Sequence, residues 1–416
     1  VMWTGNSVVA CIDKPTMEWI NERIQRKGYI WLNFPVNDFV RDHILMGPAY
    51  GNGLDIAGDV SGFVSNPMEY AETSKISLYG IADYCWNMEA YDYKSNWEKS
   101  IKNILPSNHK ALRTFALYNK DLGPNGHGFR REEGDELKDI VEKVLQGDMF
   151  ATAMLNVTCN ELEMACDILL NEKGNPQLIH EIRPWVLQCK NLAAYGRAVA
   201  LMNMLAETID NSNTTSQFIN FENLYQQARS LQKQMFDLEN NSAMRHPYQI
   251  GTKVGTKVML PTLNKLFTLA TEKYNATHGT ELNTTAEYNP YKLSSTVTQL
   301  ALLPVKLNGD VVEINPSNEV INWQAGGELL LETETTITFQ GLDFNFGVND
   351  VAKHFCLEIY VGGAWKEIPI MHYKDTDPVI HTGNELGGQT ATKLRITNKS
   401  GAEQKVYFKN FRLIRR

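Results

Sequence analysis

The sequence predicts a multidomain protein with an α/β region over residues 1–130, an α-helical bundle over 131–294 and a β-sandwich over 295–416. Three observations predict this order. Short apolar strands alternate with helical segments in the first region, the apolar period is 3.6 residues in the second, and it changes to 2 in the third. Because each period gathers apolar side chains on one face, each region is expected to build its own kind of core.

The strands of the first region recur at intervals of about 30 residues, which is the length of a βα unit. They cover residues 1–4, 29–34 and 61–65. The second strand, Tyr29-Ile30-Trp31-Leu32-Asn33-Phe34, is almost continuously apolar. Such a run is typical of a parallel strand that is covered on both faces.

Helix signals follow the first and third of these strands. Asp13 is a cap candidate, and Pro15 suits a first helical turn. We expect Gly28 to end this helix. A longer helical stretch is expected from Asn66-Pro67 to about Trp86.

The second region is predicted to be helical because its apolar residues step by three and four. One stripe runs from Phe221 to Leu238, and another from Met259 to Tyr274. Residues around Trp185 predict another long helix, which Pro184 is expected to start or kink. Amphipathic helices joined by short polar links favour an antiparallel bundle with these stripes as its core.

The third region alternates apolar and polar residues, with Gly-Gly and Asn-Asp turns between the alternating runs. This pattern predicts an antiparallel β-sandwich. Its expected strands include residues 328–332, 335–339, 356–361 and 393–397.

The composition argues against several classes of protein. A net charge of −8 argues against a broad nucleic-acid surface. No apolar run reaches the ~20 residues of a membrane-spanning helix. The six cysteines are dispersed and form no C-x-x-C pair, so they are expected to be buried free thiols and not zinc or redox sites.

Small polar side chains stand at the ends of all three strands of the first region. They are Thr4, Asn33 and Asn66, and Asp38 lies on the loop after the second strand. Ligands bind at the carboxyl ends of parallel strands, so these groups are expected to meet. Trp31 points to the same side of its strand as Asn33. Amide and carboxylate groups beside an aromatic ring suit a pyranose, whose hydroxyls take hydrogen bonds while its apolar face packs on the ring.

Each residue also has an interpretation without a ligand. Asn66 can be only a helix cap, and Trp31 can be part of the core. Asp38 can pair with Arg41 on the surface. Thr4 can be a strand-end residue without a role.

The first region shows no paired acidic motif at a strand end, although glycoside hydrolysis usually needs two carboxylates. Asp55 and Asp59 lie in a glycine-rich loop and are interpreted as turn residues. The sequence has no Gly-x-Ser-x-Gly, His-Glu-x-x-His or phosphate-binding glycine motif.

Four segments resemble glycoside hydrolase family 84, the family of bacterial β-N-acetylglucosaminidases and O-GlcNAcases, and the likeness is greatest to enzymes of the Bacteroides type. The likeness extends into the helical region and the final sandwich, which resembles galactose-binding-type modules. The four segments are Met2-Trp3-Thr4-Gly5, residues 29–38, residues 61–69 and residues 121–128.

The resemblance implies that residues 1–130 are the C-terminal part of a (β/α)8 (TIM) barrel and contain its last three βα units. Family members place two adjacent aspartates after the fourth barrel strand. One orients the substrate's 2-acetamido group, which attacks the anomeric carbon to form an oxazoline, and the other acts as general acid and base. We expect this pair upstream of Val1, so the isolated chain is expected to be inactive.

The resemblance assigns the sugar-binding wall to residues of this chain. Asn33, Asp38 and Asn66 are expected to bind sugar hydroxyls. Trp31, Thr4 and Val8 are expected to line the pocket around the acetamido group. His127 falls on a segment that lies close to the site in the family.

The expected substrate is a glycan or glycoprotein that carries terminal β-linked N-acetylglucosamine, and no metal or organic cofactor is implied. The resemblance implies a periplasmic or secreted protein, and a homodimer is compatible with it. The other hypothesis is a non-catalytic carbohydrate-binding or structural fragment, since sandwich modules of this kind bind glycans in some proteins.

Overall fold

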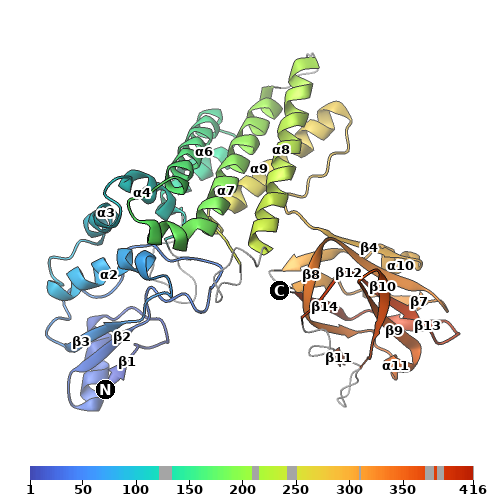
Figure 1. The fold of residues 1–416 in the computed structure, drawn as a ribbon, viewed down its shortest axis with the longest axis horizontal. Coiled ribbons are helices and arrows are strands. Elements are labelled where there is room, and N and C mark those ends of the chain that lie inside the picture. Colours follow the sequence, from blue (N-terminus) through green and yellow to red (C-terminus); the bar gives the residue numbers. More distant parts are fainter. Residues whose placement is uncertain are drawn as a thin grey trace. The chain divides into compact units, whose positions relative to one another are not determined.

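The computed structural model describes residues 1–120, 134–208, 215–240, 251–308, 311–370, 379–381 and 388–415. The chain forms two compact units, residues 1–288 and residues 289–416 (Figure 1). The first unit holds a small parallel sheet and a helical region, and the second is built from β-strands. The predicted boundary at residue 130 lies outside the described residues.

The first unit opens with the three predicted strands, β1 (Met2–Trp3), β2 (Gly28–Leu32) and β3 (Val60–Ser65). They pair in parallel, with β2 in the centre. Side chains of β2 alternate, so that Leu32 is 5% exposed on one side while Trp31 is 40% exposed on the other. The sheet is therefore covered on one face by its own core, and Trp31 is not part of that core.

Helix α1 (Lys14–Ile24) joins β1 to β2 and starts as predicted. The Asp13 carboxylate accepts a hydrogen bond of 2.9 Å from the backbone N–H of Thr16, and Pro15 lies in the first turn. The predicted end at Gly28 is wrong, because the helix stops at Gln25 in a left-handed conformation. Gly28 instead begins β2.

The next helix, α2, starts later than predicted. It covers Ala71–Trp86, so Asn66 lies five residues before it and is not its cap. Tyr84 and Ile81 of α2 pack with Ile30 and Leu32 in the core beneath the sheet. Helices α3 (Tyr93–Ile104) and α4 (His109–Leu117) follow and lead into the helical region.

The helical region continues with six further elements that share one core with α3 and α4. Trp185, predicted to lie in a long helix, is fully buried there. Pro184 lies inside its helix and does not start it, because the helix begins at Pro176. The elements are the 3₁₀ helix η1 (Asp135–Leu137), α5 (Lys138–Leu145), α6 (Met149–Leu170), α7 (Pro176–Thr208), α8 (Thr215–Asn240) and α9 (Met259–His278).

Helices α6 and α7 approach closely because Gly196 of α7 faces Cys159 of α6. A Cβ added at Gly196 would lie 2.5 Å from the Cys159 sulfur. All six cysteines are free thiols, as predicted, but only Cys159, Cys166 and Cys189 are buried, and Cys85 is exposed. The expectation of burial is thus wrong for half of them.

The second unit is dominated by one long strand, β8 (Glu328–Asn345). Its first half pairs with β12 and β4, and its second half pairs with β14 and β11. The strand thereby joins two parts of a folded sheet around a core that contains Trp323 and Phe346. The other elements are β4 (Tyr291–Ser295), α10 (Thr298–Ala301), β5 (Val305–Asn308), β6 (Val311–Ile314), β7 (Val320–Trp323), α11 (Val351–His354), β9 (Phe355–Val361), β10 (Ala364–Ile368), β11 (Val379–His381), β12 (Gln389–Asn398), β13 (Gln404–Tyr407) and β14 (Asn410–Arg415).

The architecture agrees with the predicted order of a helical region followed by a β-sandwich-like unit. The three-way division of the chain stays a prediction. Within the described residues, no helix combines the length and the apolar character that crossing a membrane requires.

Candidate functional site

The carboxyl ends of β1, β2 and β3 lie at one edge of the sheet because the three strands are parallel. Thr4, Asn33 and Asn66 follow the strands at this edge. In open parallel sheets, ligand-binding groups gather at such an edge.

Asn33 is the centre of a hydrogen-bond network. Its side-chain oxygen accepts from the indole N–H of Trp31 at 2.8 Å and from the side-chain amide of Asn66 at 3.1 Å. Its own amide donates to the backbone carbonyl of Val8 at 2.6 Å. Four of the predicted site residues are therefore in direct contact, and they come from three different segments.

The backbone of Asn66 links two segments of the site. Its N–H donates to the carbonyl of Leu32 at 2.9 Å, and its carbonyl accepts from the N–H of Val36 at 2.9 Å. These bonds continue the strand pairing past Ser65, so Asn66 is placed by the sheet and not by helix α2. The interpretation of Asn66 as a helix cap is wrong.

Asp38 and Asn66 line the same cavity, which has a volume of about 180 Å³. Asp38 itself is exposed, and within the described residues the structure records no ion pair between Asp38 and Arg41. The lining also contains four polar or aromatic residues that were not among the predicted site residues: Asn37, Arg41, Glu69 and Tyr70. Asn37 and Glu69 lie within two of the segments that resemble the family, whereas no such segment contains Arg41 or Tyr70. Burial raises the pKa of Tyr70, and Glu69 and Glu181 raise it further, so its phenol stays protonated.

Thr4 does not line this cavity. Its hydroxyl donates to the carbonyl of Ser7 at 3.1 Å. Gly5 adopts a φ of +100°, and a Cβ there would lie 2.8 Å from both Ala10 and Ile12. This glycine lets the chain turn back sharply after β1, which brings the carbonyl of Val8 over the end of β2.

The loop that carries Asp38 is tied to the helical region through Asp42. Burial acts to raise the pKa of this carboxyl, but His43 and Lys253 together hold it far below its usual range. His43 Nδ1 lies 2.7 Å from one carboxylate oxygen, and Lys253 Nζ lies 2.8 Å from the other. The indole N–H of Trp185 on α7 donates to the Asp42 carbonyl at 2.9 Å.

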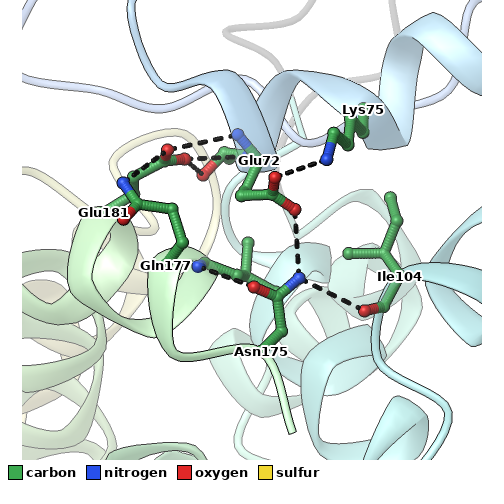
Figure 2. Close-up of polar contacts among 8 residues, drawn as sticks. Glu72, Lys75, Ile104, Asn175, Gln177 and Glu181 are labelled. Carbon is green, nitrogen blue, oxygen red and sulfur yellow. Dashed lines mark hydrogen bonds and ion pairs between the residues drawn. The ribbon is translucent and has the colours of Figure 1, made fainter.

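The segment that carries Asn66 is tied to the same helix through Glu181. The Glu181 carboxylate accepts from the backbone N–H groups of Glu72 and Thr73, at 3.2 and 2.9 Å, and from the Thr73 hydroxyl at 3.0 Å (Figure 2). A carboxylate at a helix N-terminus satisfies free N–H groups and interacts favourably with the helix dipole. Glu181 is thus the N-terminal cap of α2, supplied by another helix.

A second contact in Figure 2 strengthens this junction. Glu72 pairs with Lys75 on its own helix and accepts a hydrogen bond of 3.1 Å from Asn175, which lies just before α7. The hydrogen bonds from Lys75 and Asn175 lower the pKa of the Glu72 carboxyl. Helix α7 therefore holds both the loop that follows Asp38 and the segment that follows Asn66. Sequence spacing does not reveal this role, because the bonded residues are more than 100 positions apart.

The remaining candidate, His127, lies outside the described residues. The residues that the structure does describe contain no cluster of histidine, cysteine, aspartate or glutamate able to hold a metal ion.

Comparison with protein families identifies the chain. Residues 1–117 match the model of a beta-N-acetylglucosaminidase, and residues 137–267 match the post-catalytic domain of bacterial family 84 enzymes. The chain belongs to glycoside hydrolase family 84. Residues 282–345 of this family 84 chain also match carbohydrate binding module family 32.

Solved structures support the same fold. This family 84 chain is 22% identical to CpGH84B with a TM-score of 0.55, and the match covers 64% of this chain and 44% of that one. It is 27% identical to CpGH84D with a TM-score of 0.56, and that match covers 65% of this chain and 45% of the other. It is 20% identical to a mutant of the O-GlcNAc hydrolase of Thermobaculum terrenum with a TM-score of 0.55, and that match covers 70% of this chain and 59% of the other. The chain thus spans about half the length of these relatives.

Proposed function

We propose that this chain supplies the sugar-binding wall of a glycosidase that releases terminal β-linked N-acetylglucosamine from glycoconjugates. Family membership supports the reaction class. The observation that carries the assignment of the wall is the network of Trp31, Asn33 and Asn66 beside a cavity that Asp38 lines.

The chemistry of these groups suits one acetylated hexose. The Asp38 carboxylate accepts hydrogen bonds from two neighbouring hydroxyls, and the Asn66 amide can both donate and accept. The ring of Trp31 is 40% exposed, and its indole N–H is already bonded to Asn33. Its orientation is therefore fixed, while its apolar face is free to pack on the sugar or its acetamido methyl group.

We further propose that the three parallel βα units belong to a (β/α)8 barrel and that hydrolysis is substrate-assisted and retaining. The chain contains no two adjacent aspartates, so the pair that orients the acetamido group and transfers the proton must come from outside residues 1–416. We also propose that the protein acts on glycans outside the cytoplasm, in the periplasm or after secretion, and the match to a carbohydrate binding module supports this location.

Replacement of Asp38 tests the sugar-binding wall. We expect Asp38→Ala in the full-length protein to lower kcat/KM for an aryl N-acetylglucosaminide by at least about 100-fold, since two charge-assisted hydrogen bonds are lost. Asp55→Ala, which removes an exposed carboxylate in the glycine-rich loop, is the matched control and should leave kcat/KM unchanged. Equal activity of the Asp38→Ala and Asp55→Ala enzymes would remove Asp38 from the site.

A second candidate function, glycan binding by the β-unit, is favoured by the match to carbohydrate binding module family 32. Trp365 on the β9–β10 hairpin is poorly placed to stack on a sugar ring. The Arg395 guanidinium lies over its ring at 4.2 Å, and Tyr360 packs against it in an edge-on arrangement. Calorimetry with N-acetylglucosamine and a glycan array, both performed on residues 289–416, tests this function directly, and no binding in either assay would reject it.

A further inference from the structure

Asn37 is a buried polar residue in the wall of the cavity that Asp38 and Asn66 line. It is only 5% exposed, although its neighbour Asp38 is exposed. The hydrogen-bond network around Asn33 does not involve its side chain. Polar side chains that are buried this deeply nearly always have hydrogen-bond partners, so each end of the Asn37 amide has to be accounted for.

The nitrogen of the Asn37 amide has its partner within the same loop. It donates a hydrogen bond of 2.7 Å to the backbone carbonyl of His43. A carbonyl oxygen only accepts, so this bond identifies the nitrogen of the side-chain amide and leaves Oδ1 at the other end. Backbone hydrogen bonds of 2.9 Å from Val40 to Asn37 and from His43 to Val40 close the same loop. The side chain is therefore held in one orientation before a ligand binds.

His43, which accepts that bond, is itself held from the helical region. Its Nδ1 lies 2.7 Å from the Asp42 carboxylate, so in the neutral imidazole Nδ1 carries the proton and Nε2 is an acceptor. Nε2 lies 3.2 Å from the hydroxyl of Thr256, which donates to it and lies shortly before helix α9. Both ring nitrogens thus have a partner, and together they keep the His43 carbonyl in place for Asn37.

The side-chain oxygen of Asn37, in contrast, has no donor among the residues that the structure describes. Within this part of the chain, the one hydrogen bond of the side chain uses its nitrogen. Oδ1 is still accessible, since it is not among the fully enclosed side-chain atoms that lack a partner. Because the residue is otherwise buried and lines the cavity, this accessible atom faces the cavity. The cavity therefore contains an unused acceptor whose position is fixed by the fold.

We propose that Asn37 is a sugar-contacting residue whose Oδ1 accepts a hydrogen bond from one hydroxyl of the bound hexose. This inference rests on the proposed function and adds a specificity-determining group to it. The ionised carboxylate of Asp38 also only accepts, so the two neighbouring residues together require hydroxyls that donate. A site built to bond a hydroxyl discriminates against an analogue that lacks it, because the polar group of the site is then left unpaired. A sugar whose hydroxyl is blocked at this position is excluded for the same reason.

Deoxy analogues of an aryl N-acetylglucosaminide test this contact in the full-length protein. The analogues lack the 3-, 4- or 6-hydroxyl in turn, and kcat/KM is measured for the natural chain and for Asn37→Ala. We expect Asn37→Ala to lower kcat/KM for the parent substrate by at least about tenfold. For one analogue the same substitution should cost less than about threefold, because the hydroxyl that Asn37 binds is already missing. For the other two analogues the tenfold loss should persist.

Asn119→Ala is the matched control for this comparison. Asn119 is 3% exposed, its amide also donates to a backbone carbonyl, that of Phe115 at 3.0 Å, and it does not line the cavity. Any effect of its replacement should be the same for the parent substrate and all three analogues. The ratio between two substrates does not depend on the fraction of active protein, so a destabilised variant still gives a valid comparison. If Asn37→Ala does not fold, Asn37→Ser, which keeps a small polar group but lacks the amide oxygen, provides the same comparison.

The possible outcomes separate this inference from the proposed function. An Asn37→Ala enzyme that loses the same factor on the parent substrate and on every analogue would show that Asn37 does not contact the sugar, while the proposed function would stand. A full-length protein that releases nothing from the parent substrate would overturn the proposed function, and this inference with it.

Discussion

At the scale of single residues, the site is built by side chains that fix one another before any ligand is bound. Asn33 uses its oxygen and its amide to hold Trp31, Asn66 and the carbonyl of Val8. A ligand that binds to a preformed arrangement does not have to order it, which lowers the entropic cost of binding. Asp38, which stays exposed beside this network, is the group that we propose binds the sugar hydroxyls.

Asp42 illustrates how one partly buried charge supports the loop of Asp38. Its pKa is depressed in the folded state, so it stabilises the fold above its unfolded pKa of about 4, and this contribution is lost as the pH falls below that value. We expect Asp42→Asn to lower the free energy of unfolding by about 1–3 kcal/mol at pH 7. The difference from the natural chain should shrink by up to about 1.4 kcal/mol per pH unit below pH 4.

Urea unfolding at pH 7 and at pH 3 measures this difference. Asp55→Asn, at an exposed carboxylate, serves as the control and should cost less than about 0.5 kcal/mol at either pH. An Asp42→Asn effect that is the same at both pH values would show that the charge of Asp42 does not matter.

At the scale of elements, helix α7 organises the site without contributing to it directly. Glu181 caps α2 after the Asn66 segment, and Trp185 holds the Asp38 loop through the carbonyl of Asp42. Trp185 also packs edge-on against Tyr70, which lines the cavity, with ring centres 5.3 Å apart. One helix thereby sets the positions of both segments at once.

The cap at Glu181 can be tested by substitution. We expect Glu181→Ala to lower the free energy of unfolding by about 1–2 kcal/mol, because two helix N–H groups lose their partner. If the proposed function holds, KM of the full-length protein should rise more than kcat falls, since α2 follows the proposed sugar-binding segment. Glu181→Gln keeps one acceptor oxygen and should recover part of both effects.

Arg183→Ala, at an exposed position two residues along α7, is the control for that experiment. It should change neither the unfolding free energy nor KM. If Glu181→Ala behaves like Arg183→Ala, the carboxylate does not position the segment that leads from Asn66.

At the scale of the whole molecule, the chain forms two compact units, and we expect them to differ in whether they fold without the rest of the protein. Residues 289–416 enclose their own core around Trp323 and Phe346. The parallel sheet of the first unit has only three strands within the described residues, and β1 and β3 each pair on one side. Unpaired strand edges invite association with other chains.

We therefore expect residues 289–416, expressed alone, to unfold in a single cooperative transition. Trp323 is fully buried, so its fluorescence should shift to longer wavelength at the same midpoint as the loss of β-sheet circular dichroism. Separate midpoints for the two probes, or no cooperative transition, would show that this unit depends on the rest of the chain.

The sequence by itself determined the order of the elements and the identity of most sugar-binding candidates. Alternation along β2 and helical periodicity are local properties, and strand ends in a parallel sheet share one edge whatever the rest of the chain does. Only the tertiary structure decided that Trp31 is exposed, that Asn66 is not a cap, and that Glu181 and Trp185 brace the site. The contacts of Glu181 and Trp185 join residues more than 100 positions apart. No local pattern encodes which distant side chain will satisfy a particular backbone group.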